Sequence, residues 1–144
     1  MTIAMQKDYY KVGHPFQYPP GTNLVYSNFT ARSAKHAEKK LAGRFNGKVV
    51  VFAIQGFILD ILINTWNRDF FDRPKEEVIK EYKRIMDYTL GVDTVSTHHL
   101  AELHDLGFLP LRIKALPEGS LVNMKVPFMT ITNTRARFYW VTNM

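Results

Sequence analysis

The spacing of apolar residues changes twice along this chain of 144 residues. Residues Val25–Thr30 follow a turn rich in proline and glycine, and their alternation of apolar and polar side chains predicts a half-buried strand. Helical spacing takes over between residues 55 and 106, and alternation returns from Leu109 to Ile131. Strands on both sides of a helical block favour the α+β class, with an antiparallel sheet and helices packed on one side of it.

The clearest helix is predicted to begin at Pro74, a residue that suits the first helical turn. Glu76 and Glu77 follow it, where the positive end of the helix dipole favours acidic side chains. Its buried face is expected to carry four residues at helical spacing: Val78, Tyr82, Ile85 and Met86. A second, shorter helix is predicted over residues 95–106, with Gly107 as its C-terminal stop.

The remaining segments complete the expected fold. Residues 48–54 are rich in valine and isoleucine and predict a strand that runs into a buried helix over residues 55–62. Alternation over residues 109–116, a turn over Pro117–Ser120 and the apolar residues up to 131 predict two or three antiparallel strands. A chain of this length buries roughly 68–70% of its unfolded surface, so we expect one folded domain over residues 1–144.

Residues 138–144 have the pattern of an amphipathic helix that is only beginning. Three aromatic residues stand together there: Phe138, Tyr139 and Trp140. Such a group at a chain end needs a covering surface, which we expect from a second polypeptide, so the domain is expected to be truncated in this helix.

The chain contains no cysteine, which excludes disulfides, thiol catalysis and thiolate metal ligands. A reducing compartment, the cytoplasm, is the expected location. The first residues lack the charged head and apolar run of a secretory signal. The longest apolar stretch, residues 57–63, contains Asp60 and falls short of the roughly 20 residues that a membrane helix needs. We therefore expect a soluble protein.

The net charge of +6 is unevenly distributed. Six basic residues lie close together in the sequence: Arg32, Lys35, Lys39, Lys40, Arg44 and Lys48. Such a cluster can meet phosphate, and a nucleic-acid surface is one interpretation of it. A solvated loop is the favoured interpretation, and nucleic acid is not expected as a partner.

Three histidines, His98, His99 and His104, raise the question of a metal site. His98 and Glu102 stand one helical turn apart, a spacing that presents two ligands on one face. The order HExxH is missing, and so are glycine-rich phosphate loops and the serine of a nucleophile elbow. We therefore expect this chain to bind no metal and no cofactor by itself.

The order of residues is more specific than their composition in three places. The first begins with Asp8-Tyr9-Tyr10-Lys11 and continues through His14, Gln17-Tyr18-Pro19-Pro20 and Arg32; the second is Leu109-Pro110-Leu111-Arg112-Ile113-Lys114-Ala115-Leu116-Pro117-Glu118-Gly119; the third is Asn133-Thr134 with Tyr139-Trp140-Val141-Thr142-Asn143. In order and spacing these residues resemble the N-terminal portion of the nicotinamide phosphoribosyltransferase family. The resemblance spans nearly the whole chain.

The resemblance implies a pentosyltransferase that moves a 5-phosphoribosyl group from phosphoribosyl pyrophosphate to nicotinamide, giving nicotinamide mononucleotide for NAD salvage. It also implies Mg²⁺ bound with the pyrophosphate, and a homodimer whose active sites lie between subunits. Tyr10 matches the family's tyrosine that stacks on nicotinamide, Asp8 its neighbouring aspartate, and Arg32 its phosphate-contacting arginine. Tyr9, where the family usually has serine, and Pro15, where it commonly has an aromatic residue, depart from the pattern.

The family's phosphoribosyl-binding barrel follows the point that corresponds to Met144. A chain without the barrel lacks most catalytic residues, so we expect no turnover from it alone. A homo-oligomer or a separate chain carrying the barrel would complete the site. Two alternatives remain: a noncatalytic module that pairs with a full-length transferase, and a fragment that resembles a nicotinate phosphoribosyltransferase, because the group that recognises the amide lies outside this chain.

Overall fold

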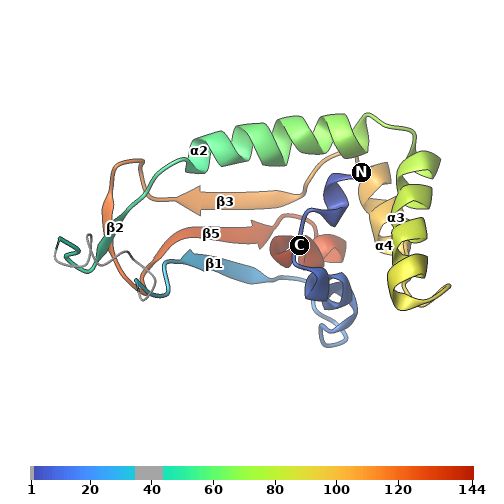
Figure 1. The fold of residues 1–144 in the computed structure, drawn as a ribbon, viewed down its shortest axis with the longest axis horizontal. Coiled ribbons are helices and arrows are strands. Elements are labelled where there is room, and N and C mark those ends of the chain that lie inside the picture. Colours follow the sequence, from blue (N-terminus) through green and yellow to red (C-terminus); the bar gives the residue numbers. More distant parts are fainter. Residues whose placement is uncertain (1, 35–43) are drawn as a thin grey trace.

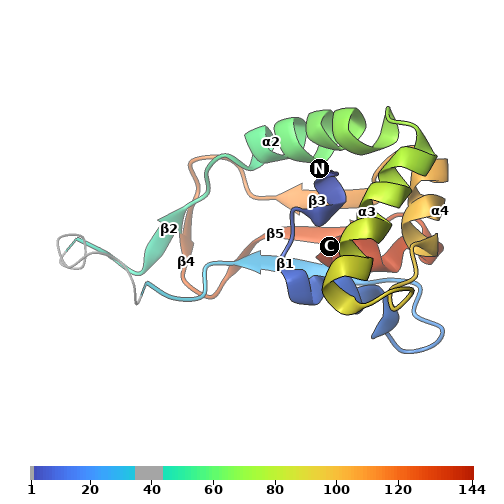
Figure 2. The same ribbon diagram turned by 45° about the vertical axis from the view of Figure 1, so that its right-hand side comes forward.

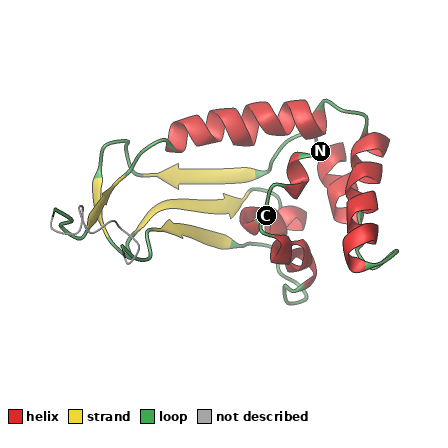
Figure 3. Cartoon of the chain, in the orientation of Figure 1, coloured by secondary structure: helices red, strands yellow, loops and turns green. Residues whose placement is uncertain are grey.

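The computed structural model describes residues 2–34 and 44–144. Three strands form the main sheet in the order β1 (Tyr26–Thr30), β5 (Pro127–Asn133) and β3 (Leu111–Ala115), and both pairings are antiparallel. A smaller antiparallel sheet pairs β2 (Lys48–Val50) with β4 (Leu121–Asn123). Helical segments lie alongside the main sheet and at one of its ends (Figures 1 and 3), which confirms the expected α+β class.

A continuous helical segment runs beside β3 from Ile54 to Phe71 (Figure 1). It begins as α2 (Ile54–Phe57) and continues with π-helical hydrogen bonds through η3 (Ile58–Thr65) and η4 (Asn67–Phe71). Ile54 and Ile58 pack against the apolar face of the main sheet. Among the described residues, no helix is long and apolar enough to span a membrane.

The prediction for this region is wrong in two respects. The strand ends at Val50 rather than at residue 54, because Ala53 adopts the left-handed conformation with φ 64° and turns the chain into the helix. The helix is also not fully buried: Ile54 and Ile58 pack on the sheet, but Phe57, Leu59 and Ile63 are exposed.

The two predicted helices are confirmed. They are α3 (Lys75–Leu90) and α4 (His98–Leu106), and the latter begins three residues later than predicted. Gly107 ends α4 with φ 79°, a conformation that glycine adopts without steric cost. Five side chains on the inner faces of these helices are fully buried: Val78, Tyr82, Met86, Leu100 and Leu103.

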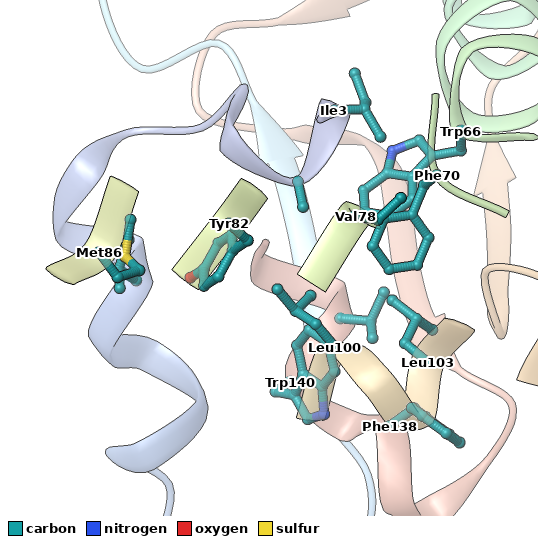
Figure 4. Close-up of a cluster of buried hydrophobic side chains, with 13 residues drawn as sticks. Ile3, Trp66, Phe70, Val78, Tyr82, Met86, Leu100, Leu103, Phe138 and Trp140 are labelled. Atoms are coloured by element: carbon teal, nitrogen blue, oxygen red, sulfur yellow. The ribbon is translucent and has the colours of Figure 1, made fainter. Parts of the chain in front are cut away.

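The main core lies where the helices meet the two ends of the chain. Near the N-terminus the 3₁₀ segments η1 (Ile3–Met5) and η2 (Tyr9–Phe16) contribute Ile3 and Val12 to it. Figure 4 shows Ile3, Trp66 and Phe70 close to the side chains of α3 and α4. The N-terminal segment is therefore anchored on the helical part of the domain.

The chain end also differs from its prediction. Residues Ala136–Asn143 form a 3₁₀ segment, η5, in which Phe138 is 7% and Trp140 5% exposed (Figure 4). The expectation that these aromatics need a second polypeptide is wrong, because α4 and the N-terminal segments already cover them.

The predicted turn over Pro117–Ser120 is present, with Gly119 at φ 84° and a hydrogen bond from Ser120 N–H to the Pro117 carbonyl. At this turn the chain passes from the main sheet to the smaller one: β3 before the turn pairs with β5, and β4 after it pairs with β2. Within this turn, the Glu118 carboxylate accepts hydrogen bonds from the N–H groups of Ala53 (2.7 Å) and Gln55 (3.1 Å). Glu118 thereby fixes the start of the helical segment.

Candidate functional site

Tyr10 lies on η2 with 65% of its surface exposed. Asp8 directly precedes η2, and its carbonyl accepts the N–H of Lys11 at 2.9 Å. Asp8 is exposed as well. Asp8 and Tyr10 are therefore both exposed, two positions apart in the sequence. The next ring on the segment is that of His14, edge-on to Tyr10 with centroids 5.4 Å apart.

Contacts with the main core and with α3 and α4 fix the position of η2, the helix that carries Tyr10. Val12 is buried in the main core, and Phe16 meets the ring of His99 edge-on at 5.4 Å. The hydroxyl group of Tyr9 contacts the hydroxyl group of Thr89 at the end of α3. Tyr10 is therefore an exposed aromatic ring on a fixed support, a suitable arrangement for contact with a flat ligand.

Lys7, just before this helix, is largely buried, with its ammonium group 5.8 Å from the centre of the Tyr82 ring. Burial lowers the pKa of Lys7 to about 8, and the nearby charge of Lys11 acts in the same direction. The segment leading to Asp8 is thus tied to α3 by a side chain that is only partly protonated in mildly alkaline solution.

A hollow of about 250 Å³ lies next to the Tyr10 helix and is lined by His14, Gln17, Tyr18 and Asn143. The Asn143 amide donates to the Tyr18 hydroxyl at 2.8 Å and accepts from the Ser27 hydroxyl at 2.8 Å. The lining carries no carboxylate and no permanent cation, so it suits a neutral polar group. Local sequence patterns do not predict this hollow, because Asn143 reaches it from the other end of the chain.

Arg32 lies elsewhere. It is exposed and comes two residues after the end of β1, the strand that leads away from the Tyr10 helix toward the two-stranded sheet (Figure 1). The five residues of β1 span about 17 Å at about 3.4 Å per residue. A ligand that contacts both Tyr10 and Arg32 of one chain therefore has to extend along the sheet.

Three of the six clustered basic residues, Lys35, Lys39 and Lys40, lie outside the described residues. The other three, Arg32, Arg44 and Lys48, are exposed.

The three histidines have separate environments. His98 is exposed and lies 2.9 Å from the Glu102 carboxylate, which also receives the guanidinium group of Arg137. His104 contacts the Arg73 carbonyl through Nε2 at 2.9 Å. Within residues 2–34 and 44–144, no group of three histidine, aspartate or glutamate side chains is arranged to hold a metal ion.

His99 is the buried member of the three. Burial lowers its pKa from 6.5 to about 4, and Lys7 adds a smaller effect in the same direction. The imidazole is therefore neutral at pH 7, and it makes edge-on contacts with the rings of Phe16 and Trp140.

Comparison with known proteins gives consistent results. The profile of the family described as nicotinamide phosphoribosyltransferase, N-terminal domain, matches residues 2–113. A nicotinamide phosphoribosyltransferase of Acinetobacter baylyi is 54% identical over 94% of this chain and 26% of its own length. One from Xanthomonas campestris pv. campestris is 26% identical over 96% of this chain and 26% of its own length.

Among solved structures, human nicotinic acid phosphoribosyltransferase superposes with a TM-score of 0.54 at 14% identity. The match covers 94% of this chain and 23% of the human one, and it shows a shared fold. The chain spans about a quarter of the length of the relatives it matches.

Proposed function

Because the chain belongs to the nicotinamide phosphoribosyltransferase family, as an N-terminal domain of it, we propose that it supplies one edge of the active site of such an enzyme. The proposed reaction transfers the 5-phosphoribosyl group of phosphoribosyl pyrophosphate to the ring nitrogen of nicotinamide. The products are nicotinamide mononucleotide and pyrophosphate. The remainder of the enzyme carries the phosphoribosyl-binding barrel, either in a longer polypeptide or in a second one.

The exposure of Tyr10 on an anchored helix is the observation that carries this proposal. Its phenol ring offers a flat face on which the neutral pyridine ring of nicotinamide can stack. Asp8, exposed on the same segment, is the proposed neighbouring contact of the substrate.

Arg32 is the proposed phosphate contact. Its guanidinium group offers forked donors to phosphate oxygens. Arg32 follows the C-terminal end of β1, the end of the strand that lies away from Tyr10. In the proposed dimer, where Tyr10 of one subunit reaches the site of the other, Arg32 and Tyr10 of one chain contribute to different sites.

The proposed setting is a cytoplasmic dimer in which Tyr10 of one subunit reaches the site of the other. Mg²⁺ would accompany the pyrophosphate group of the substrate.

A chimera tests the proposal. Residues 1–144 replace the matching N-terminal quarter of the Acinetobacter baylyi relative, and formation of nicotinamide mononucleotide is measured. We expect Tyr10→Ala to lower kcat/KM at least about tenfold, and Tyr10→Phe to keep most of the activity because the flat ring remains. Tyr88→Ala is the matched control, since Tyr88 is an even more exposed tyrosine on α3.

The outcome that contradicts the proposal is an active chimera whose activity is unchanged by Tyr10→Ala. Formation of the product by the purified 144-residue chain alone would contradict the statement that it supplies only an edge of the site. The alternative of a noncatalytic module predicts that adding the chain changes the activity of an intact relative.

A further inference from the structure

The main sheet has one apolar face and one polar face, and the proposed function uses neither of them directly. Side chains alternate along each strand, so Ile113 and Ile131 lie on the face that packs against α2 and η3. The three strands lie side by side in the order β1, β5, β3 (Figure 2). By their register, the opposite face carries six residues in two rows: Tyr26, Thr132 and Arg112 in the first, Asn28, Thr130 and Lys114 in the second.

This polar face has a positive charge without a counter-charge of its own. None of the three strands contains aspartate or glutamate. Arg112 and Lys114 are exposed, and within the described residues no hydrogen bond or ion pair is formed by either side chain. Their Cα atoms are about 7 Å apart along β3, close enough for both cations to reach one anion.

The neighbouring strand adds neutral donors. Thr130 lies opposite Lys114, and Thr132 lies opposite Arg112, at the spacing of paired strands. A forked guanidinium group, an ammonium group and two hydroxyl groups thus converge on one surface. Such a set matches the several acceptor oxygens of a phosphate group better than the two oxygens of a carboxylate.

The same face is hollowed beside these donors. A depression of about 270 Å³ is lined by Leu24, Tyr26, Arg112, Lys114, Thr130, Thr132 and Asn133. The buried Asn133 side chain holds the rim in place, because its amide accepts from Val25 N–H and donates to the Asn23 carbonyl, each at 2.9 Å. Leu24 and Tyr26 therefore form a fixed apolar wall next to the cations.

We propose that this face binds a phosphate-bearing small molecule with a planar ring, a nucleoside monophosphate. Arg112, Lys114 and the two threonine hydroxyls hold its phosphate group, and the ring rests against Tyr26. The size of the depression suits one such molecule rather than a polymer. The proposal is independent of the active-site proposal, since it does not involve Asp8, Tyr10 or Arg32.

Titration of the 144-residue chain with adenosine monophosphate, inorganic phosphate and adenosine tests this inference. We expect adenosine monophosphate to bind more tightly than either part alone. The variant Arg112→Gln/Lys114→Gln should weaken its binding at least about tenfold, because two charge-assisted contacts are lost. Tyr26→Leu should reduce the affinity for adenosine monophosphate to that for phosphate, and leave the affinity for phosphate unchanged.

The matched control is Lys80→Gln/Arg84→Gln, which removes the same two charges from the surface of α3. If this control variant binds adenosine monophosphate with an affinity within about twofold of that of the original chain, the result supports the proposal. An equal loss in both double variants would show general charge attraction and overturn it, as would no binding by a chain whose circular dichroism is native. If Tyr26→Leu lowered the affinity for inorganic phosphate, that result would also overturn the roles assigned to Tyr26 and to the cations.

Discussion

The imidazole of His99 meets the indole of Trp140 edge-on, with ring centroids 4.9 Å apart and planes at 83°. Phe16 meets the same imidazole from the N-terminal segment, also edge-on. One side chain of α4 thus joins η2, which presents Tyr10, to η5 at the other end of the sequence. The support of the candidate site depends on this histidine remaining neutral.

His99 is expected to make stability depend on pH. Its pKa is 6.5 in the unfolded chain and about 4 in the folded protein, so the unfolded state binds the proton first as the pH falls. The stabilisation is complete above pH 6.5 and is lost progressively toward pH 4. Between pH 7 and 5 the original chain should lose about 2 kcal/mol more stability than His99→Phe in urea unfolding.

Asn143 is expected to stabilise the contact between η5, β1 and Tyr18. Its amide forms one hydrogen bond with Ser27 and one with Tyr18, both at 2.8 Å. Asn143→Ala should lower the free energy of unfolding by about 1–3 kcal/mol, since both partners lose their bond. Tyr18→Phe, which removes only one bond, should cost about half as much. Equal stability of the Asn143→Ala variant and the original chain would contradict this role.

Glu118 is expected to act as a cap for the helical segment that begins at Ile54. Its carboxylate accepts the N–H groups of Ala53 and Gln55, which the helix itself leaves without partners. Glu118→Ala should lower the free energy of unfolding, measured by thermal melting, by about 1–2 kcal/mol. Glu118→Gln keeps an acceptor oxygen and should lose less. If both variants melt like the original chain, the carboxylate has no capping role.

Phe70 is expected to be a major contributor to the main core. It is fully buried and makes edge-on contacts with Trp66 and Phe71 at centroid distances of 5.2 and 5.0 Å. Phe70→Ala should lower the free energy of unfolding by about 3–5 kcal/mol because it removes those contacts and leaves a cavity. Phe52→Ala is the control: Phe52 is 80% exposed, so the change should cost less than about 0.5 kcal/mol. Similar losses in both variants would contradict the assigned core.

The sequence by itself determined the elements whose signals are local. The helix after Pro74 follows from a periodic apolar face, and Gly107 ends α4 because a left-handed residue is needed there. The two helix signals depend on residues within a few positions of one another. Order and spacing in three segments, around Asp8 and Tyr10, over residues 109–119 and over residues 133–143, also indicated the family, which the profile match confirms.

Only the tertiary structure decided how distant segments meet. Strand pairing in an antiparallel sheet depends on contacts between residues far apart in the chain, so local patterns did not reveal that β2 pairs with β4 while β1 pairs with β5. The same holds for Trp140, which the sequence suggested as a surface for another polypeptide and which the chain itself buries. It also holds for Arg112 and Lys114, whose common face with Tyr26 exists only because β5 lies between their strands.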